Sequence, residues 1–357
     1  EIVINAEKLL IGLMEIYSPT YSEGEAVGYL TEQMENTGFQ AEIDPAGNAI
    51  GRIGSGEQHV LLLGHIDTVP GKLPVRKQGD LLFGRGAVDA KGPLAAFVAA
   101  ASQCTNQNIR ITVVGAVHEE GNSAGASHLR QHFPKPDALI IGEPSRWDQV
   151  TLGYKGSVTY MLTATSDVAH PASKKTGVCE TTVTAWDKIV TWTNEFNQGR
   201  SMTFEKLTPT LRTMHSDSDG IVEHAQLQVT FRLPEGLSVP EMDSQIRDLI
   251  GNDIAIESLA AAVPAYRAPK NTGLVRSALA SIRTQGGKPR FLLKTGTSDM
   301  NIVAPTWRCP TIAYGPGDSS LDHTPDEHVS LSEFRRSIVV IRDIIERLGT
   351  SGQLLKK

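Results

Sequence analysis

The chain has 357 residues, enough for one large α/β domain or for two domains with separate cores. Its 40% apolar and 21% charged residues are typical of a globular protein and exclude a disordered one. The formal net charge of -6 gives no general attraction to nucleic acid or to an anionic membrane, so we expect neither as a partner.

The cysteines, the apolar runs and the opening segment indicate the cellular compartment of the protein. Cys104, Cys179 and Cys309 lie far apart and lack the paired spacing of a zinc ribbon or a redox motif. No apolar run reaches the roughly 18 residues of a membrane span. The opening EIVINAEKLLIGLMEIYS lacks a basic leader followed by a small-residue cleavage site. We therefore expect a cytoplasmic protein.

The first 150 residues predict helices that alternate with buried strands. Residues 4–20 and 22–39 place apolar side chains at helical spacing, the second stretch with Ser22 as its expected cap. Three short apolar runs follow, HVLLLGHIDTV, NIRITVVGAVHEE and PDALIIGEPS, and an alanine-rich helix with Pro93 in its first turn separates the first two. Continuously apolar strands between helices indicate an α/β fold, a mixed and mostly parallel sheet flanked by helices.

The pattern changes near residue 152, where alternating apolar and polar residues indicate half-exposed antiparallel strands. After residue 264 the α/β pattern returns, with a helix near 272–286, the strand TIAYG and a final helix in SLSEFRRSIVVIRDIIERLG. We therefore predict a discontinuous domain, 1–151 and 265–357, and an inserted α+β domain, 152–264.

Ionisable side chains follow each of the three apolar runs. His65 and Asp67 follow the first, Glu119 and Glu120 the second, and Glu143 the third. Ligands of open α/β sheets bind outside the carboxyl ends of the strands, so we expect these groups to converge on one site.

Two further candidate ligands complete this set. Asp89 lies in the glycine-rich turn GRGAVDAKG before a helix, and His323 lies in SLDHTPDEH. Mixed carboxylate and imidazole ligands suit zinc or a similar ion such as cobalt or manganese. Five candidate ligands are too many for one ion but suit two ions that share a carboxylate. Such ions lie about 3.5–4 Å apart, activate water and polarise a carbonyl, which predicts a hydrolase.

Five motifs in order, GHIDTVPG, GRGAVDAKG, HEEGNSAG, IIGEPS and DHTPDEH, resemble the dinuclear zinc metallopeptidase family. That family includes aminoacylase, carboxypeptidase G, acetylornithine deacetylase and succinyl-diaminopimelate desuccinylase. The resemblance covers the whole chain. It implies two Zn²⁺ per subunit, or Co²⁺ in their place, a zinc-peptidase-like catalytic domain, and a lid domain at 152–264 that forms a homodimer.

The resemblance also implies roles for single residues. One zinc is held by His65 and Glu143 and the other by Glu120 and His323, while Asp89 bridges both and precedes a cis peptide bond to Ala90. Asp67 orients His65 through the far ring nitrogen. Glu119 is the general base, and successive side chains that leave a strand point in different directions, so Glu119 faces the water while Glu120 binds metal.

Two residues of the inserted domain are the expected substrate contacts. His170 in SDVAHPAS matches the family's oxyanion histidine, although it departs from the usual Gly-His-x-x-x-Pro form and an ordinary loop histidine is the alternative. Arg232 in LQVTFRLP matches a carboxylate-binding arginine, for which a guanidinium fork is suited, with an exposed strand-end arginine as the alternative.

The segment KTGTSDMN most resembles the [amino-group carrier protein]-lysine and -ornithine hydrolases of this family. Those enzymes cleave the amide between the γ-carboxyl of the carrier's C-terminal glutamate and the α-amino group of lysine or ornithine. The resemblance implies a small acidic carrier protein as partner. Four residues would line the substrate pocket, or else form only a tight turn of small residues: Thr295, Gly296, Thr297 and Ser298.

Several alternatives stay open. The same chemistry would serve an acetylornithine deacetylase, a succinyl-diaminopimelate desuccinylase or a small-peptide carboxypeptidase. A non-catalytic binding protein would be expected to have lost ligands or the base, and here these positions are filled. The sequence leaves open the choice between lysine and ornithine, the metal, the oligomeric state, whether His170 acts in its own subunit, and the role of His118.

Overall fold

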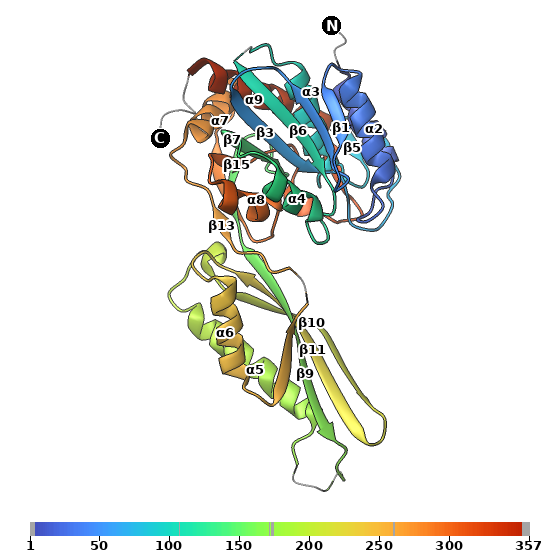
Figure 1. The fold of residues 1–357 in the computed structure, drawn as a ribbon, viewed down its shortest axis with the longest axis vertical. Helices are drawn as coiled ribbons and strands as arrows, with labels where there is room; N and C mark the ends of the chain where they lie inside the picture. The colour runs from blue at the N-terminus through green and yellow to red at the C-terminus, as the bar shows by residue number, and fades with distance from the viewer. Residues whose placement is uncertain (1–3, 107, 171, 173–174, 260, 352–357) are drawn as a thin grey trace. The chain divides into compact units, whose positions relative to one another are not determined.

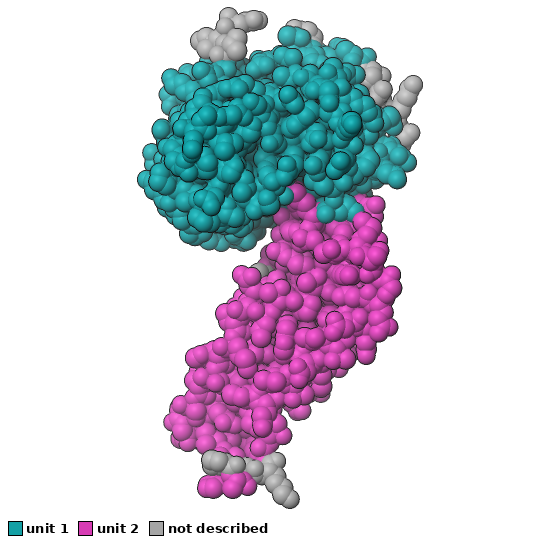
Figure 2. Space-filling view, turned by 180° about the vertical axis from the view of Figure 1, so that it is seen from behind, with its two compact units in different colours: residues 1–153, 268–293, 298–357 teal, residues 154–267, 294–297 magenta. Residues whose placement is uncertain are grey.

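The computed structural model describes residues 4–106, 108–170, 172, 175–259 and 261–351. The chain forms two compact units, coloured separately in Figure 2. Unit 1 comprises residues 1–153, 268–293 and 298–357, and unit 2 comprises residues 154–267 and 294–297. Unit 2 begins two residues later and ends three residues later than the inserted domain that we expected at 152–264. It also includes residues 294–297, which we expected in the discontinuous domain.

Unit 1 is built on a mixed sheet with the strand order β1-β2-β6-β3-β7-β15-β8. The four central strands, β6, β3, β7 and β15, are parallel, and antiparallel pairs flank them on both sides. The bounds are β1 (Gln40–Ile43), β2 (Ala49–Ile53), β3 (Gln58–His65), β6 (Ile109–Ala116), β7 (Ala138–Gly142), β8 (Gln149–Tyr154) and β15 (Thr311–Ala313). The predicted α/β class is confirmed, with the parallel part confined to the centre.

Helices cover both faces of this sheet. Val60 and Leu62 of β3 share a core with five helices, while Leu61 and Leu63 of the same strand are fully buried on the opposite face. In Figure 1, α4 (Ala124–His132) and α8 (Asp299–Trp307) lie on the viewer's side of the sheet. The five helices are α1 (Ala6–Glu15), α2 (Gly24–Glu35), α3 (Lys91–Ser102), α7 (Gly273–Thr284) and α9 (Leu331–Ser351). Burial on both faces explains why the strands are continuously apolar.

Two local features position the site. A Cβ added at Gly142 would lie 2.8 Å from the Phe97 ring and 3.1 Å from the Gly64 Cα, so glycine lets α3 pack closely on the strand ends. A small second sheet has the order β16-β5-β4, with β4 (Arg76–Gln78), β5 (Leu81–Phe83) and β16 (His328–Ser330). It joins the segment before α3 to the segment before α9.

Helix α2 begins two residues later than the expected cap. Its N-cap residue is Glu23, whose side chain accepts no capping hydrogen bond, and Ser22 is exposed outside the helix. Among the described residues, no helix is long and apolar enough to cross a membrane.

Unit 2 is an antiparallel sheet with the order β10-β11-β9-β12. Residues of β9 and β11 alternate between buried and half-buried positions, as their sequence pattern predicts, and the buried ones pack with α5 and α6. The bounds are β9 (Gly156–Asp167), α5 (Val178–Phe196), β10 (Thr208–Ser218), β11 (Val222–Leu233), α6 (Val239–Ile250) and β12 (Ile254–Ser258). Two short strands that come later in the chain, β13 (Tyr266–Arg267) and β14 (Arg290–Lys294), do not belong to this sheet.

Candidate metal centre

The ionisable residues of unit 1 lie at the carboxyl ends of the parallel strands. His65 is the last residue of β3, and Glu143 directly follows β7. Asp89 lies in the turn before α3, and His323 lies just beyond the short helix Ser319–Leu321. The strand ends therefore bring together side chains that are up to 258 residues apart in the sequence.

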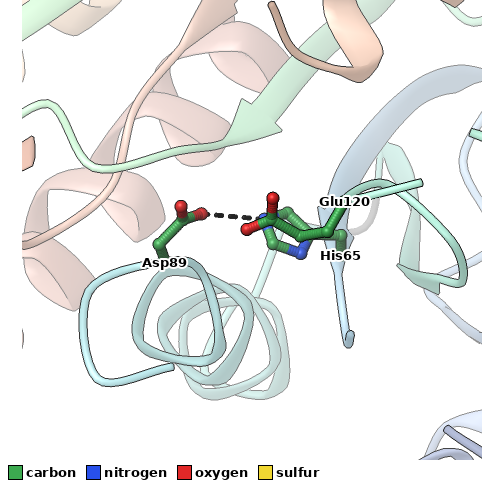
Figure 3. Close-up of side chains that lie close together, drawn as sticks. All are labelled: His65, Asp89 and Glu120. Carbon is green, nitrogen blue, oxygen red and sulfur yellow. Dashed lines mark hydrogen bonds and ion pairs between the residues drawn. The ribbon is translucent and has the colours of Figure 1, made fainter. Parts of the chain in front are cut away.

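Asp89 lies between two histidines. Its Oδ1 is 3.0 Å from Nε2 of His65, and its Oδ2 is 2.9 Å from Nε2 of His323. Figure 3 shows the Asp89 carboxylate pointing at the His65 ring, with Glu120 beside it. Each carboxylate oxygen thus faces a different imidazole, an arrangement that suits a carboxylate shared by two ions.

The remaining acidic residues divide between the two histidines. Glu120 Oε1 is 2.9 Å from Nε2 of His323, whereas Glu143 Oε1 and Glu119 Oε2 are each 3.9 Å from Nε2 of His65. Among the described residues, His65, Asp89 and Glu120 offer ligand atoms that all lie within 4.8 Å of one another. Imidazole nitrogens and carboxylate oxygens at this spacing fit divalent metal ions of the zinc type.

The two adjacent glutamates diverge for a reason other than the expected strand pleat. Strand β6 ends at Ala116, so Glu119 and Glu120 lie in a turn. His118 enters this turn with φ 66°, a left-handed conformation. Its carbonyl oxygen accepts hydrogen bonds from the amides of Gly121 and Ser123. The turn geometry therefore aims the two carboxylates.

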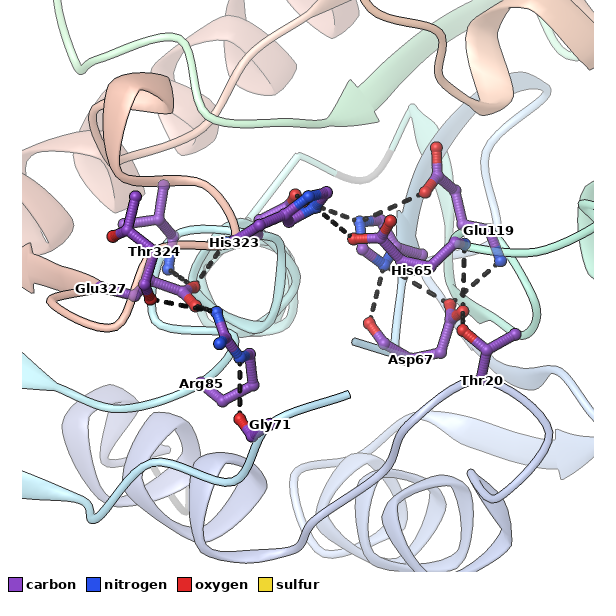
Figure 4. A network of polar contacts seen from close by, with 12 residues as sticks. Thr20, His65, Asp67, Gly71, Arg85, Glu119, His323, Thr324 and Glu327 are labelled. Atoms are coloured by element: carbon purple, nitrogen blue, oxygen red, sulfur yellow. Dashed lines mark hydrogen bonds and ion pairs between the residues drawn. The ribbon is translucent and has the colours of Figure 1, made fainter. Parts of the chain in front are cut away.

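Three consecutive backbone amides of this turn donate to buried carboxylates. The amide of His118 donates to Glu23 Oε1 (3.2 Å), and those of Glu119 and Glu120 donate to Asp67 Oδ1 and Oδ2 (3.0 and 3.1 Å). Thr20 Oγ1 also donates to Asp67 Oδ2 at 2.8 Å, as Figure 4 shows. Asp67 thus holds the turn that carries both glutamates.

Asp67 also meets the far nitrogen of His65, mainly through its backbone. His65 Nδ1 lies 2.9 Å from the carbonyl oxygen of Asp67 and 3.5 Å from its carboxylate Oδ1. A ring N–H that donates to a carbonyl fixes the tautomer and leaves Nε2 free to bind a metal. The peptide bond between Asp89 and Ala90 is cis, as the resemblance implied.

The acidic crowding perturbs the titration of the centre. Burial would lower the pKa of His65, but Glu119, Asp67 and Asp89 raise it well above its usual value. Burial raises the pKa of Glu119 well above its usual range, and Glu143 adds to the increase. Hydrogen bonds to Asp89 and Glu120 raise the pKa of His323 to about 10. The protein thus favours positive charge here, which a dication would supply.

The expected substrate residues other than Ser298 belong to unit 2. In unit 2, Arg232 Nη1 donates to Thr297 Oγ1 at 3.4 Å, and His170 is exposed in the segment after β9, where its Nδ1 accepts from the amide of Ala172 at 3.1 Å. Burial lowers the pKa of Arg232. Thr295 is exposed and Gly296 half-buried.

Ser298 belongs to unit 1 and has a structural role that the pocket expectation did not include. It is the N-cap of α8, where its hydroxyl accepts from the amide of Met300 at 3.2 Å. Its own amide donates to Asn301 Oδ1 at 2.9 Å, which completes a capping box. Ser298 therefore caps α8, and its place in a substrate pocket stays a prediction.

Sequence reasoning gave no role to several residues around the centre. Asp299 is buried, and burial raises its pKa to about 7 beside His65 and Asp67. Arg85 and Glu327 form a buried ion pair at 2.8 Å. Both lie inside motifs that carry a metal ligand, which is the signal that could have found them. The residues missed are Thr20, Glu23, Arg85, Asp299 and Glu327.

Comparison with known proteins agrees with this geometry. Residues 61–347 match the model of peptidase family M20/M25/M40. The [LysW]-lysine hydrolase of Deinococcus radiodurans is 39% identical over 355 residues, covering 96% of this chain and 97% of that protein. A putative [LysW]-lysine/[LysW]-ornithine hydrolase of Thermococcus kodakarensis is 41% identical over 337 residues, covering 94% and 90%.

Solved structures share the fold at low sequence identity. The M20 family metallo-carboxypeptidase Sso-CP2 from Sulfolobus solfataricus aligns with a TM-score of 0.79 at 16% identity, covering 97% of this chain and 99% of that chain. The aminopeptidase PepT from Bacillus cereus gives a TM-score of 0.77 at 17% identity, with the same coverage. The family match spans most of the chain and the curated relatives exceed 30% identity, so this protein belongs to peptidase family M20/M25/M40.

Proposed function

We propose that this protein is a two-metal amidohydrolase that releases lysine, ornithine or both from a small acidic amino-group carrier protein. The bond cleaved is the amide between the γ-carboxyl of the carrier's C-terminal glutamate and the α-amino group of the released amino acid. The observation that carries the proposal is Asp89, whose two oxygens face His65 and His323. The substrate class follows the names of relatives at 39% and 41% identity.

The residues that would hold the ions follow from the donor set. His65 and Glu143 would hold one Zn²⁺, Glu120 and His323 the other, and Asp89 both; Co²⁺ could replace either ion. The distances that support this division are 2.9 Å between Glu120 and His323 and 3.9 Å between Glu143 and His65. When bound, two such ions lower the pKa of water and polarise a carbonyl oxygen.

Glu119 is the proposed general base. Its side chain is 12% exposed, and its backbone amide is held by Asp67, so the carboxylate reaches the centre from a fixed turn. In the reaction it accepts a proton from the attacking water as the oxygen bonds to the γ-carbonyl carbon. It then donates that proton to the α-amino nitrogen as the C–N bond breaks, leaving a free γ-carboxylate and the amino acid.

Unit 2 supplies the proposed contacts to the rest of the substrate. Arg232 would bind the α-carboxylate of the released amino acid, and its hydrogen bond to Thr297 supports that role by holding the guanidinium in place. His170 would stabilise the oxyanion, in its own subunit or in a partner, with Thr295 and Gly296 completing the pocket. Residues 152–264 would form the lid and the homodimer contact. The proposed compartment is the cytoplasm.

The test is a comparison of substrates with one enzyme preparation. Purified protein is loaded with Zn²⁺ or Co²⁺ and supplied with carrier-linked lysine, carrier-linked ornithine, acetylornithine and succinyl-diaminopimelate. We expect kcat/KM to be highest for a carrier-linked substrate. A preference for a small acyl substrate by more than about tenfold, roughly 1.4 kcal/mol in the transition state, would make the protein a deacylase instead.

Arg232→Lys tests the proposed contact to the amino acid that is released. Lysine keeps the positive charge but loses the planar fork that binds a carboxylate through two hydrogen bonds. If Arg232 binds the amino acid released, KM for carrier-linked lysine should rise while the metal content stays the same. An unchanged KM would remove Arg232 from the substrate site.

A further inference from the structure

A buried carboxylate links the segments that carry Asp89 and His323. Glu327 is 1% exposed and lies four residues beyond His323. Its Oε1 accepts from the backbone amides of Val88 and Asp89, at 3.0 and 3.1 Å. The His323 segment therefore holds the backbone of Asp89 itself.

Arg85 completes the link from the other side. Its Nη1 donates to Glu327 Oε2 at 2.8 Å and to the carbonyl oxygen of Thr324 at 3.3 Å. Its Nε donates to the carbonyl oxygen of Gly71 at 3.0 Å. Figure 4 shows this guanidinium between Gly71, Thr324 and Glu327. One side chain thus joins the Asp89 turn to the residue that follows His323.

A contribution to the free energy of unfolding is a weak explanation for a buried ion pair such as Arg85 and Glu327. Replacing a buried ion pair by well-packed apolar side chains is often neutral or stabilising, because desolvation offsets the attraction. An apolar pair could not make the directed hydrogen bonds of Glu327 and Arg85, which join specific backbone atoms of both segments. These bonds fix the separation between Asp89 and His323, whose side chains are 2.9 Å apart.

The His323 position depends on that separation. The His323 side chain is 49% exposed and sits on a left-handed backbone, with φ 63°. His65, by contrast, is 1% exposed and ends a central strand. A shift of the loop would therefore displace His323 from Asp89 and Glu120 while leaving His65 in place.

We propose that Glu327 and Arg85 are positioning residues that set the metal affinity of the site formed by Glu120 and His323. They act through the backbone of Asp89 and through the carbonyl of Thr324, and neither is a ligand. The proposal rests on the two-metal function above. It predicts that disturbing the pair weakens one metal position far more than the other.

The test is a Co²⁺ titration of the metal-free protein, followed by visible absorption and by the number of ions retained. Glu327→Gln keeps one oxygen for the amides of Val88 and Asp89 but places an NH₂ group against Arg85. We expect the affinity for the second Co²⁺ to fall by about 10- to 100-fold, with the first changed by less than about threefold.

Arg85→Lys is the second variant if Glu327→Gln folds poorly. Lysine keeps a charge beside Glu327 but cannot also reach the Gly71 and Thr324 carbonyls with a fork of donors. It should show the same selective loss. The double variant should lose little more than the worse single variant, because the two residues act as one unit.

Glu333→Gln is the matched control. Glu333 also accepts from two backbone amides, those of Trp147 at 3.0 Å and Gly317 at 3.2 Å, but neither amide belongs to a proposed metal ligand, whereas Glu327 accepts from the amide of Asp89. It should lower thermal stability without changing either Co²⁺ affinity.

The outcomes separate the two proposals. Wild-type protein that binds a single Co²⁺ would overturn the two-metal function. Wild-type protein that binds two, with both affinities unchanged or equally reduced in Glu327→Gln and Arg85→Lys, would overturn the positioning role alone.

Discussion

The two sides of the metal centre are built differently. On the His65 side, His65 and Asp67 are 1% and 0% exposed; His65 ends a strand that is buried on both faces, and Asp67 follows it. On the His323 side, the histidine is 49% exposed and stands on a loop that Arg85 and Glu327 hold. The first side gains its geometry from the core of the sheet, and the second gains it from hydrogen bonds between loops.

This difference shows how a fold can combine a rigid ligand with an adjustable one. Burial in the sheet leaves His65 little freedom, because the surrounding strands and α3 are close-packed. His323 has no such packing and depends on a few directed polar contacts. Loss of a single polar contact should therefore matter more on the His323 side, and loss of the ligand itself should cost more stability on the His65 side.

The largest expected effect comes from Glu119→Gln, which removes no proposed metal ligand. The amide cannot accept the proton, so kcat should fall by about 10²- to 10⁴-fold while both metal ions remain bound. Glu120→Gln is the control, because Glu120 is equally exposed at 12% and lies next in the chain. That variant should lose metal from the His323 side. Loss of metal from Glu119→Gln would instead identify Glu119 as a ligand.

Comparing His65→Ala with His323→Ala tests the two sides directly. In metal-free protein, removing the buried His65 leaves Asp67, Asp89 and Glu119 without the cation between them, and should lower the free energy of unfolding by about 3 kcal/mol. Removing the half-exposed His323 should cost about 1 kcal/mol or less. Urea unfolding of both proteins measures the difference. Equal costs would mean that the sheet does not support one side more than the other.

Asp67→Asn should have the next largest effect. The carboxylate accepts the amides of Glu119 and Glu120 with separate oxygens, and asparagine would turn an NH₂ group toward one of them. We expect kcat/KM or metal affinity to fall by about 10- to 100-fold. Asp219→Asn is the control, since Asp219 also accepts two amides at 2.8 Å but in unit 2. Similar losses from both would indicate a general folding defect.

Thr20→Val should have the smallest effect. It removes one hydrogen bond to Asp67 Oδ2, while the two amide donors stay in place. The expected cost is about 1 kcal/mol, a loss of no more than about tenfold in kcat/KM. Thr20→Ser should restore the wild-type value because it keeps the hydroxyl. If serine failed to restore it, the methyl group would be what Thr20 contributes.

Much of the fold could be predicted because its signals are local. Continuous apolar runs predicted the central strands, and alternation predicted β9 and β11 of unit 2, since the number of buried faces determines each pattern. The expected cap Ser22 was wrong because Glu23 occupies the position before the helix and turns its carboxylate to the amides of Tyr21 and His118. That contact joins residues 95 positions apart and leaves no local trace.

The sequence alone determined which residue types meet at the strand ends, because parallel strands deliver their last side chains to one edge. It also gave His65, Asp89, Glu120, Glu143 and His323 as one candidate set through the order of its motifs. Only the tertiary structure decided how the two adjacent glutamates are aimed. The left-handed turn at His118 and the amides held by Asp67 depend on contacts between distant segments, and so does the link of Arg85 and Glu327. Such contacts follow from packing, which no local pattern encodes.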